Sequence, residues 1–268
     1  MKAVVLARGL GTRMMAHDES AKLLSAQEAV AGTGVKSLVP IEGRPFLDYV
    51  LSGLADAGCD EMCLVIGPEH HVIRERYTAI VPPRRFRVAF AIQDKPQGTA
   101  DAVLAAEAFA NRGEFLVINS DNYYPLQALR ALISLGRPGT ILFTPSGLIS
   151  HSNLEAARIR GFALAMLGED GCLDGLVEKP DEKELRGRGA APLISMNCWR
   201  FPSAIFTACR GLTASPRGEF EITDAVAGLI AAGHRLKVLT SDEGVLDLSR
   251  KGDIGPVVER LRGARVEL

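Results

Sequence analysis

A glycine-rich turn with the sequence GLGTRM, residues 9–14, directly follows a short apolar run near the start of the chain. Glycine tolerates the backbone dihedral angles of tight turns, so backbone N–H groups in such a turn can approach phosphate oxygens closely. Arg13 lies within the turn, and its planar guanidinium offers a fork of donors that matches phosphate. The pattern predicts a phosphate-binding turn with Arg13 among the ligand contacts. The alternative is a surface arginine in an ordinary turn.

Two familiar glycine-rich loops do not fit this turn. The dinucleotide-binding pattern G-x-G-x-x-G requires a small residue where Met14 stands, and an acidic residue at the end of the second strand, which ends instead at Gly67. The P-loop pattern is imitated by GTGVKS at residues 32–37, but Val35 occupies its required glycine and no strand precedes it. The pattern that fits is G-x-G-T-R-[ML] after a first strand, followed by K-x-L-x-P, which KSLVP at residues 36–40 matches.

Further polar residues follow later apolar segments. Asp121 comes just after the apolar run FLVI, where a carboxylate faces the ligand crevice and suits Mg²⁺, which pairs with phosphates through one or two carboxylates. The alternative for Asp121 is an Asx turn that starts the next loop. Gln93 can offer an acceptor and donors to a ligand, and Gly98 allows close backbone approach. Their alternatives are a strand-end glutamine and a glycine at a helix N-cap.

The elements that must position these residues alternate regularly in the first half of the chain. The hydrophobic pattern predicts strands and helices in turn, which is typical of a mainly parallel sheet with helices on both faces and ligands at the carboxyl ends of its strands. The expected strands are residues 2–7, 61–67, 87–93, 114–119 and 140–144, and the expected helices are residues 45–57, 69–79, 99–110 and 125–135.

The second half of the chain does not continue the regular alternation of strands and helices. Residues 160–171 and 173–177 are expected to form a hairpin that turns at residues 169–171. A strand at 193–201, helices at 203–211 and 222–232, a strand at 236–240 and a last helix at 254–262 follow. We expect one domain over residues 1–268, with a nucleotide-binding half, residues 1–145, and a second half, residues 146–268, that closes over another substrate.

Composition narrows the function classes. The chain has 268 residues with 47% hydrophobic and 24% charged residues, which is ordinary for a globular protein, and its net charge of −1 provides no basic field for nucleic acid. Its five cysteines form no C-x-x-C pair, which favours reduced thiols. The first residues have a strand pattern without the cleavage region of a signal peptide, and no apolar run approaches the roughly 20 residues of a membrane span. We therefore expect a cytoplasmic protein with no nucleic-acid or membrane partner.

At GLGTRM and KSLVP the chain resembles the sugar-phosphate nucleotidyltransferases, or nucleoside-diphosphate-sugar pyrophosphorylases. The resemblance continues in order through the helix up to residue 60, Gln93 with GTADA at 98–102, NSDN at 119–122, EKP at 178–180 and EFEITD at 219–224, and covers residues 1 to about 250. It implies an α/β fold with a mixed, mostly parallel, Rossmann-like doubly wound sheet (GT-A-like). It also implies Mg²⁺-dependent transfer of a nucleotidyl group from a nucleoside triphosphate, UTP or dTTP being favoured, to a sugar 1-phosphate, with release of pyrophosphate.

The resemblance also implies roles for individual residues. Arg13 would hold the β- and γ-phosphates, and Lys36 would bridge the incoming and leaving phosphates. Lys22 is a rival for Lys36, because its distance from Arg13 is nearer the family's usual spacing, but the sequence that follows Lys36 fits better. Asp121 and Asp247 would share the metal. The implied nucleotide-binding residues are Leu6, Ala7, Gly9, Gly11, Thr12, Arg13, Gln93, Gly98 and Thr99, and the implied sugar-phosphate-binding residues are Glu178, Lys179, Asn197 and Glu221.

Some positions depart from the family pattern. Ser120 precedes Asp121, the tryptophan and Gly-Thr usually found near the second metal aspartate are missing around Asp247, and the Tyr-Gly sugar clamp is not evident near residues 160–163. These departures keep open a nucleotide- or sugar-phosphate-binding regulator with little turnover, or an enzyme with a non-sugar acceptor such as phosphocholine or an alditol phosphate. Arg8 stands where relatives have a small residue, and its side chain is expected to point either to solvent or to a phosphate. The identity of the sugar and self-association as a homo-oligomer are left open.

Overall fold

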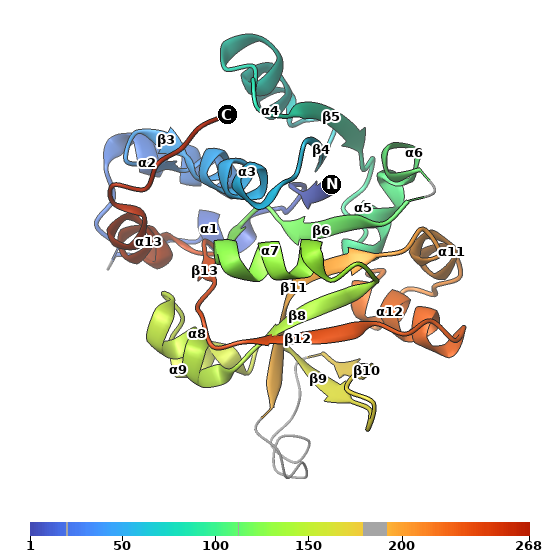
Figure 1. Cartoon of the computed structure of the whole chain (residues 1–268). Helices are drawn as coiled ribbons and strands as arrows, with labels where there is room; N and C mark the ends of the chain where they lie inside the picture. The colour runs from blue at the N-terminus through green and yellow to red at the C-terminus, as the bar shows by residue number, and fades with distance from the viewer. Residues whose placement is uncertain (20, 112, 179–191) are drawn as a thin grey trace.

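A nine-stranded sheet forms the centre of the computed structural model, which describes residues 1–19, 21–111, 113–178 and 192–268 (Figure 1). The strands run in the order β10-β9-β11-β6-β1-β4-β5, and β8 and β12 extend the sheet beside β11. The strands of this sheet are β1 (Lys2–Leu6), β4 (Glu61–Ile66), β5 (Arg87–Ile92), β6 (Phe115–Asn119), β8 (Gly139–Phe143), β9 (Ala163–Leu167), β10 (Leu173–Val177), β11 (Leu193–Phe201) and β12 (Lys237–Ser241).

The helices and short strands complete the chain. The helices are α1 (Thr12–Met15), α2 (Ser25–Ala31), α3 (Phe46–Ala57), α4 (His71–Glu75), α5 (Thr99–Ala105), α6 (Glu107–Ala110), α7 (Leu126–Ser134), α8 (Pro145–His151), α9 (Ala156–Ile159), α11 (Ile205–Arg210), α12 (Ile222–Ala231) and α13 (Ile254–Leu261), with short turns η1 (Lys36–Leu38), η2 (Arg76–Ile80) and η3 (Lys251–Asp253). Two small ribbons pair β2 (Pro40–Ile41) with β3 (Arg44–Pro45), and β7 (Asn122–Tyr123) with β13 (Leu246–Asp247). None of these helices, in the residues described, has the length and apolar character to cross a bilayer.

The strands of the first half are parallel, as the alternating pattern predicts. β1 lies between β4 and β6 and is parallel to both, and β5 continues the parallel order beyond β4. The carboxyl ends of these strands therefore lie at one edge of the sheet. The segments that follow β1, β5 and β6 meet there, and they carry the glycine-rich turn, Gln93 and Asp121.

The second half adds the antiparallel part of a mixed sheet. β11 is antiparallel to β6, β8 and β9, and β9 pairs with β10 in the hairpin expected from the sequence. The register of β11 against β8 shifts between Ser195 and Trp199, and Asn197 within this bulge has a φ of 56°. A β-bulge redirects side chains at the point where it occurs, and this one lies where the strand passes the cleft described below.

Helices cover both faces of the sheet, because successive side chains of a strand point to opposite faces. Ala3 and Val5 of β1 pack into one core with α3, α7 and α13, whereas Val4 packs into the other with α5, α11 and α12 (Figure 1). Both cores are strongly apolar, and Trp199 is fully buried in the second with its ring stacked on that of Phe201. The predicted doubly wound α/β arrangement is therefore confirmed.

Several elements differ from the sequence expectation. The helix expected at 69–79 divides into α4 and the π-helical turn η2, where Arg76 and Tyr77 both donate hydrogen bonds to the buried Asp48 on α3. The helix expected at 99–110 is interrupted at Ala106, which leaves the helical conformation with a ψ of 6°. The choice of Lys36 implies an inserted segment after Arg13 with a helix around residues 19–30, but the helix in this segment, α2, begins only at Ser25. Helices α8 and α9 and the β7–β13 ribbon were not expected, because elements this short have too few residues for a periodic pattern.

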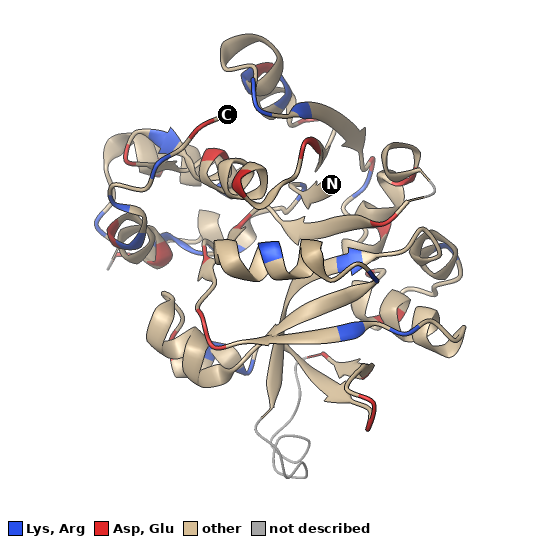
Figure 2. Ribbon diagram, viewed as in Figure 1, with Lys and Arg blue, Asp and Glu red and all other residues tan. Residues whose placement is uncertain are grey.

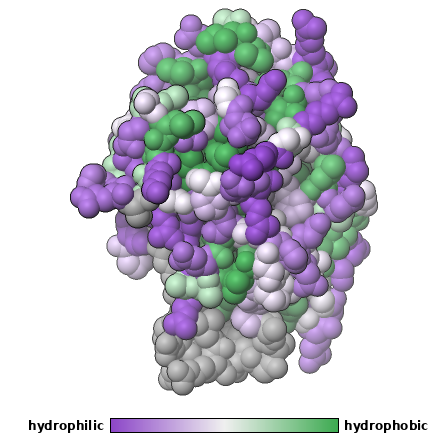
Figure 3. Space-filling view, turned by 90° about the vertical axis from the view of Figure 1, so that its left-hand side faces the viewer, coloured by the Kyte–Doolittle hydropathy of each residue, from purple (hydrophilic) through white to green (hydrophobic). Residues whose placement is uncertain are grey.

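Charged residues of both signs are interspersed over the elements (Figure 2). On the side of the molecule that carries α2 and α13, hydrophobic residues form separate patches among hydrophilic ones (Figure 3). The segment between Arg13 and Lys36 contributes to this exposed apolar surface, since Leu24 is 71% exposed. This face of the molecule is thus mixed in character.

Candidate active site

A cleft at the carboxyl edge of the parallel strands consists of two adjoining cavities. The smaller cavity, of about 380 Å³, is lined by the glycine-rich turn and the segments around Lys36 and Gln93. The larger cavity, of about 820 Å³, extends toward β11, α9 and the start of α12. Both cavities are lined by Thr12, Arg13, Thr99, Asn119, Asp121, Glu219 and Ser249. The shared residues make one continuous cleft, at the place where open α/β sheets bind their ligands.

The glycine-rich turn presents unused backbone donors to the smaller cavity. Gly11 has a φ of 62°, and a Cβ there would lie 2.0 Å from the carbonyl oxygen of Gly34, so only glycine fits this position. Within the described residues, the N–H groups of residues 9–12 make no hydrogen bond. Arg13 is exposed in α1 and lines both cavities. Among the described residues, the turn therefore combines N–H groups and a guanidinium that have no hydrogen-bond partner, which is an arrangement that favours anions.

Lys36 is brought against the turn from a distant part of the sequence. It begins η1, and its aliphatic chain lies next to Gly9, where an added Cβ would be 3.4 Å from its Cε. Its Nζ forms an ion pair with Oδ2 of Asp121, and the two side chains are only 16% and 15% exposed. Lys22, the rival in the sequence, is exposed and lines neither cavity.

Asp121 and Asp247 lie side by side although the sequence separates them widely. Asp247 is paired with Asn122 across the β7–β13 ribbon, and the N–H of Leu248 donates to the carbonyl oxygen of Asp121 at 2.8 Å. Burial raises the pKa of the Asp247 carboxyl above its usual range, and the negative charge of Asp121 raises it further. The two carboxylates thus repel each other in a confined place, which a divalent cation between them would relieve.

Arg158 holds Asp247 from the far side. Its Nη2 donates to Oδ1 of Asp247 at 2.5 Å, and its Nη1 donates to Oδ1 of Asp253 at the same distance. Nδ2 of Asn122 donates to Oδ2 of Asp247 at 3.1 Å. Arg158 lies on α9, a helix that the sequence pattern did not reveal, so this positioning residue was missed.

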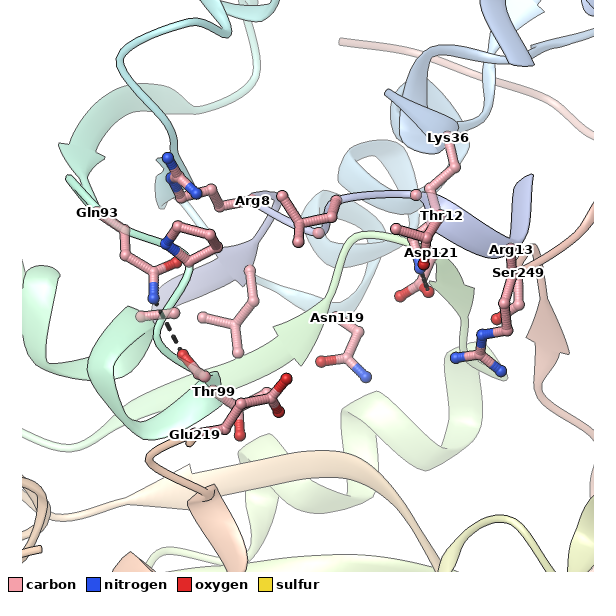
Figure 4. A pocket seen from close by; sticks show the side chains of 17 residues that line it. Arg8, Thr12, Arg13, Lys36, Gln93, Thr99, Asn119, Asp121, Glu219 and Ser249 are labelled. Atoms are coloured by element: carbon pink, nitrogen blue, oxygen red, sulfur yellow. Dashed lines mark hydrogen bonds and ion pairs between the residues drawn. The ribbon is translucent and has the colours of Figure 1, made fainter. Parts of the chain in front are cut away.

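Gln93 is fixed in one orientation at the opposite end of the smaller cavity (Figure 4). It is buried, and its Nε2 donates to the carbonyl oxygen of Gly98 at 3.0 Å and to Oδ2 of Asp101 at 2.7 Å. Because both partners are acceptors, the amide nitrogen must face them, and Oε1 is left as an acceptor for a ligand. Gly98 has a φ of 111° and packs against the backbone of Phe220, which a Cβ would approach to 2.5 Å.

The larger cavity contains the residues predicted to bind the second substrate. Glu221 accepts a hydrogen bond from Nη2 of Arg217 at 2.7 Å, and Glu178 lies 3.8 Å from the same nitrogen. Asn197 lines this cavity from the β11 bulge, with its Oδ1 accepting from Trp199. Arg217 was missed from the sequence, although its place just before the EFEITD segment is a signal that could have identified it.

Most of the predicted residues meet in the cleft. The smaller cavity is lined by Leu6, Gly9, Gly11, Thr12, Arg13, Lys36, Gln93, Gly98, Thr99 and Asp121, and the larger one by Glu178, Asn197, Glu221 and Asp247. Ala7 is not among the lining residues, because it is buried and its N–H continues the pairing with β4 by donating to Val65. The hydroxyl of Thr99 accepts from the N–H of Ile222, which ties α5 to α12. Lys179 lies outside the described residues.

Comparisons with known proteins agree with the fold and the motifs. A model of the nucleotidyl transferase family matches residues 2–249. The chain is 30% identical over 240 residues to glucose-1-phosphate thymidylyltransferase of Streptomyces griseus, covering 88% of this chain and 59% of the relative. It is 28% identical to the bifunctional protein GlmU of Methanococcus vannielii, covering 86% of this chain and 48% of the relative. It therefore spans about half to three fifths of the length of these relatives.

A shorter relative and a solved structure match over nearly their whole length. The UTP–glucose-1-phosphate uridylyltransferase AglF of Haloferax volcanii is 26% identical over 262 residues, covering 98% of this chain and 97% of the relative. The crystal structure of a UDP-glucose pyrophosphorylase complexed with UDP-glucose superimposes with a TM-score of 0.73 at 17% identity, covering 98% of this chain and 99% of the other. At that identity the structural likeness establishes the shared fold.

Proposed function

We propose, from the premise that this chain belongs to the nucleotidyl transferase family, that it transfers a nucleotidyl group from a nucleoside triphosphate to a sugar 1-phosphate and releases pyrophosphate. One observation carries the proposal: the free N–H groups of the turn, Arg13, Lys36 and the Asp121–Asp247 pair converge on one cleft. These are the groups needed to bring two highly charged phosphates together. The nucleotide would occupy the half formed by residues 1–145, and the sugar 1-phosphate the half formed by residues 146–268.

The chemistry requires positioning and neutralisation of charge more than covalent catalysis. An oxygen of the sugar 1-phosphate forms a bond to the α-phosphorus while the bond from that phosphorus to the bridging oxygen breaks, and the electron pair leaves with pyrophosphate. The N–H groups of residues 9–12 and the guanidinium of Arg13 bind the β- and γ-phosphates. Lys36, beside Gly9, places its positive charge between the incoming and leaving phosphates.

Asp121 and Asp247 would hold Mg²⁺, whose positive charge would neutralise the phosphates during transfer. The negative charge of Asp121 contributes to the raised pKa of Asp247, and two such adjacent carboxylates suit a small divalent cation. Arg158 and Asn122 fix the orientation of the Asp247 carboxylate through separate oxygens. Lys36 balances the charge of Asp121 before the substrate phosphates enter.

The second substrate would bind in the larger cavity. Arg217 is 41% exposed there and, with Lys179 as predicted from the EKP motif, would hold the phosphate of the acceptor. Glu178, Asn197 and Glu221 offer oxygens to the sugar hydroxyls. UTP or dTTP is the preferred donor in this proposal, and the five free thiols accord with the cytoplasmic location expected from the sequence.

The test is a pyrophosphate-release assay. The protein is incubated with Mg²⁺ and each of ATP, GTP, CTP, UTP and dTTP, together with a panel of sugar 1-phosphates, phosphocholine and alditol phosphates. The proposal predicts release with UTP or dTTP and a sugar 1-phosphate, above that of an Arg13→Ala control. Release only with a non-sugar phosphate would replace the acceptor, and triphosphate binding with no release for any acceptor would replace the enzyme by a regulator.

A further inference from the structure

Arg8 is buried at the end of β1 with most of its donors unused. Its side chain is only 6% exposed. Nη2 donates to Oε2 of Glu69 at 3.3 Å and to the carbonyl oxygen of Asp94 at 3.2 Å. Nε and Nη1 are also buried, and within the described residues neither has a hydrogen-bond partner. Unpaired buried N–H groups are costly and uncommon, so these two need an acceptor that the folded chain does not supply.

The position of Arg8 differs from both possibilities that the sequence left open. It does not point to solvent, since the residue is 9% exposed. Its guanidinium also lies away from Arg13, Lys36 and Asp121, at the end of the smaller cavity that contains Gln93 (Figure 4). The hydrogen bond to Asp94 fixes it beside the residue that follows Gln93. Arg8 therefore lies at the end of the cavity farthest from the phosphate-binding groups.

The donors and acceptors at this end form a distinct pattern. Gln93 offers only Oε1, because both hydrogens of its Nε2 are used by Gly98 and Asp101. The N–H of Gly98 has no partner in the part of the chain described. With Arg8 the cavity therefore offers an acceptor together with donors from two different segments. Uracil and thymine present the complement, an N–H between two keto oxygens, whereas cytosine and adenine place an amino group where a keto oxygen is needed.

We propose that Arg8 is a specificity-determining residue that donates from Nη1 to a keto oxygen of the nucleotide base, beside the N–H that Gln93 accepts. The inference rests on the proposed function for the presence of a nucleotide, and adds the group that selects its base. A guanidinium cannot accept a hydrogen bond, so an amino group at the same place meets repulsion and leaves the arginine unpaired. Guanine has one keto oxygen and the N–H in common with uracil. Its amino group, however, would meet the N–H of Gly98, which is another donor, and would therefore find no acceptor there.

The test measures equilibrium binding of UTP, dTTP and CTP, with Mg²⁺ and without an acceptor, by calorimetry. The parent is expected to prefer UTP or dTTP to CTP. Arg8→Met, which keeps the packing of the stem, should weaken the preferred triphosphate about 10- to 100-fold and leave CTP nearly unchanged. Arg8→Lys should behave similarly, because it keeps the charge near Glu69 but removes Nε and Nη1. Arg210→Met, at an exposed ion pair with Glu107 that lines neither cavity, is the matched control and should keep the ratio of affinities within about twofold.

A probe of the base distinguishes recognition from support of the fold. If Arg8 bonds a keto oxygen, replacing either O2 or O4 by sulfur, in 2-thio-UTP or 4-thio-UTP, should weaken binding to the parent, and one of these losses should disappear in Arg8→Lys. Two results would overturn the assignment of Arg8. One is a parallel loss of UTP and CTP binding in both Arg8 variants, and the other is an equal response of the parent and Arg8→Lys to both thio analogues. Binding of no triphosphate by the parent would overturn the proposed function as well.

Discussion

Lys36→Met separates the proposed mechanism from its nearest alternative, because Lys22 has the spacing from Arg13 that the family usually shows. Lys36 lines the smaller cavity and pairs with Asp121, whereas Lys22 is exposed and lines neither cavity. We expect Lys36→Met to lower kcat about 100- to 1,000-fold, which corresponds to the roughly 2.7–4 kcal/mol lost with one preorganised donor at a developing charge. Lys22→Met should change kcat by less than about twofold, as surface substitutions do.

The same substitution has a separate effect on stability. Asp121 is 15% exposed and loses its cationic partner in Lys36→Met. A mostly buried acceptor left without its partner costs about 1–3 kcal/mol, which for a chain of this size lowers Tm by about 2–12 °C. The variant therefore stays folded at about 25 °C when the parent has an ordinary mesophilic Tm. The fall in kcat can then be assigned to the reaction and not to unfolding.

The assay is pyrophosphate release at saturating Mg²⁺ and substrates, using the triphosphate and acceptor that give the parent its highest rate, with Tm measured by calorimetry on the same samples. A Lys36→Met variant that keeps more than about a tenth of the parental kcat would refute the role given to Lys36. Equal losses in Lys36→Met and Lys22→Met would also refute it. A loss confined to Lys22→Met would transfer the role to Lys22.

Further predictions concern stability, the thiols and the metal. Arg158→Met leaves Asp247 and Asp253 buried without their shared partner, so the free energy of unfolding measured in urea should fall by about 3–5 kcal/mol. Arg235→Met removes an exposed ion pair and should cost less than about 1 kcal/mol. Equal effects of the two substitutions would contradict the role of Arg158 in holding the two carboxylates. Burial raises the pKa of three thiols to about 12, and these belong to Cys59, Cys63 and Cys209. At pH values below the unfolded pKa of about 8.5, the neutral thiols contribute their full stabilisation of the fold. This contribution is lost as the pH rises toward about 12, so the free energy of unfolding under reducing conditions should fall from about pH 8 to pH 10. The native thiols should also resist labelling at about pH 8, and rapid labelling would contradict their burial. Asp121→Asn should raise the Mg²⁺ concentration for half-maximal activity at least about tenfold, and an unchanged requirement would remove Asp121 from the metal site.

The first half of the fold could be predicted because its strands and helices are long enough for their hydrophobic period to be read. The strand ends then located Arg13, Gln93 and Asp121 at one edge of the sheet, since parallel strands present their carboxyl ends together. The choice of Lys36 over Lys22 depended on the sequence after it, and the structure places Lys36 in the cavity. The strand and helix inferences needed only local pattern and the rule for parallel sheets, whereas the choice of Lys36 also needed the resemblance to a family motif.

The remaining parts of the site depend on contacts between distant segments that leave little local pattern. Asp247 meets Asp121 through a ribbon of two-residue strands, too short to show alternation in the sequence. Arg158 lies on a four-residue helix, and its two carboxylate partners come from about 90 residues away. The direction of Arg8 is set by Glu69 and Asp94, which lie in the segments that follow β4 and β5, so its type and sequence position could not reveal that it lies at the Gln93 end of the cavity.

The transfer of label from the α-phosphate tests the central claim most directly. The protein is incubated with Mg²⁺, a sugar 1-phosphate and UTP or dTTP that carries ³²P at the α-position, and the products are separated by anion exchange. We predict that the label appears in a nucleoside diphosphate sugar in equal amount to the pyrophosphate released, and that formation of this product fails in Lys36→Met. Label that stays in the triphosphate, or appears only in the nucleoside mono- or diphosphate, would contradict nucleotidyl transfer.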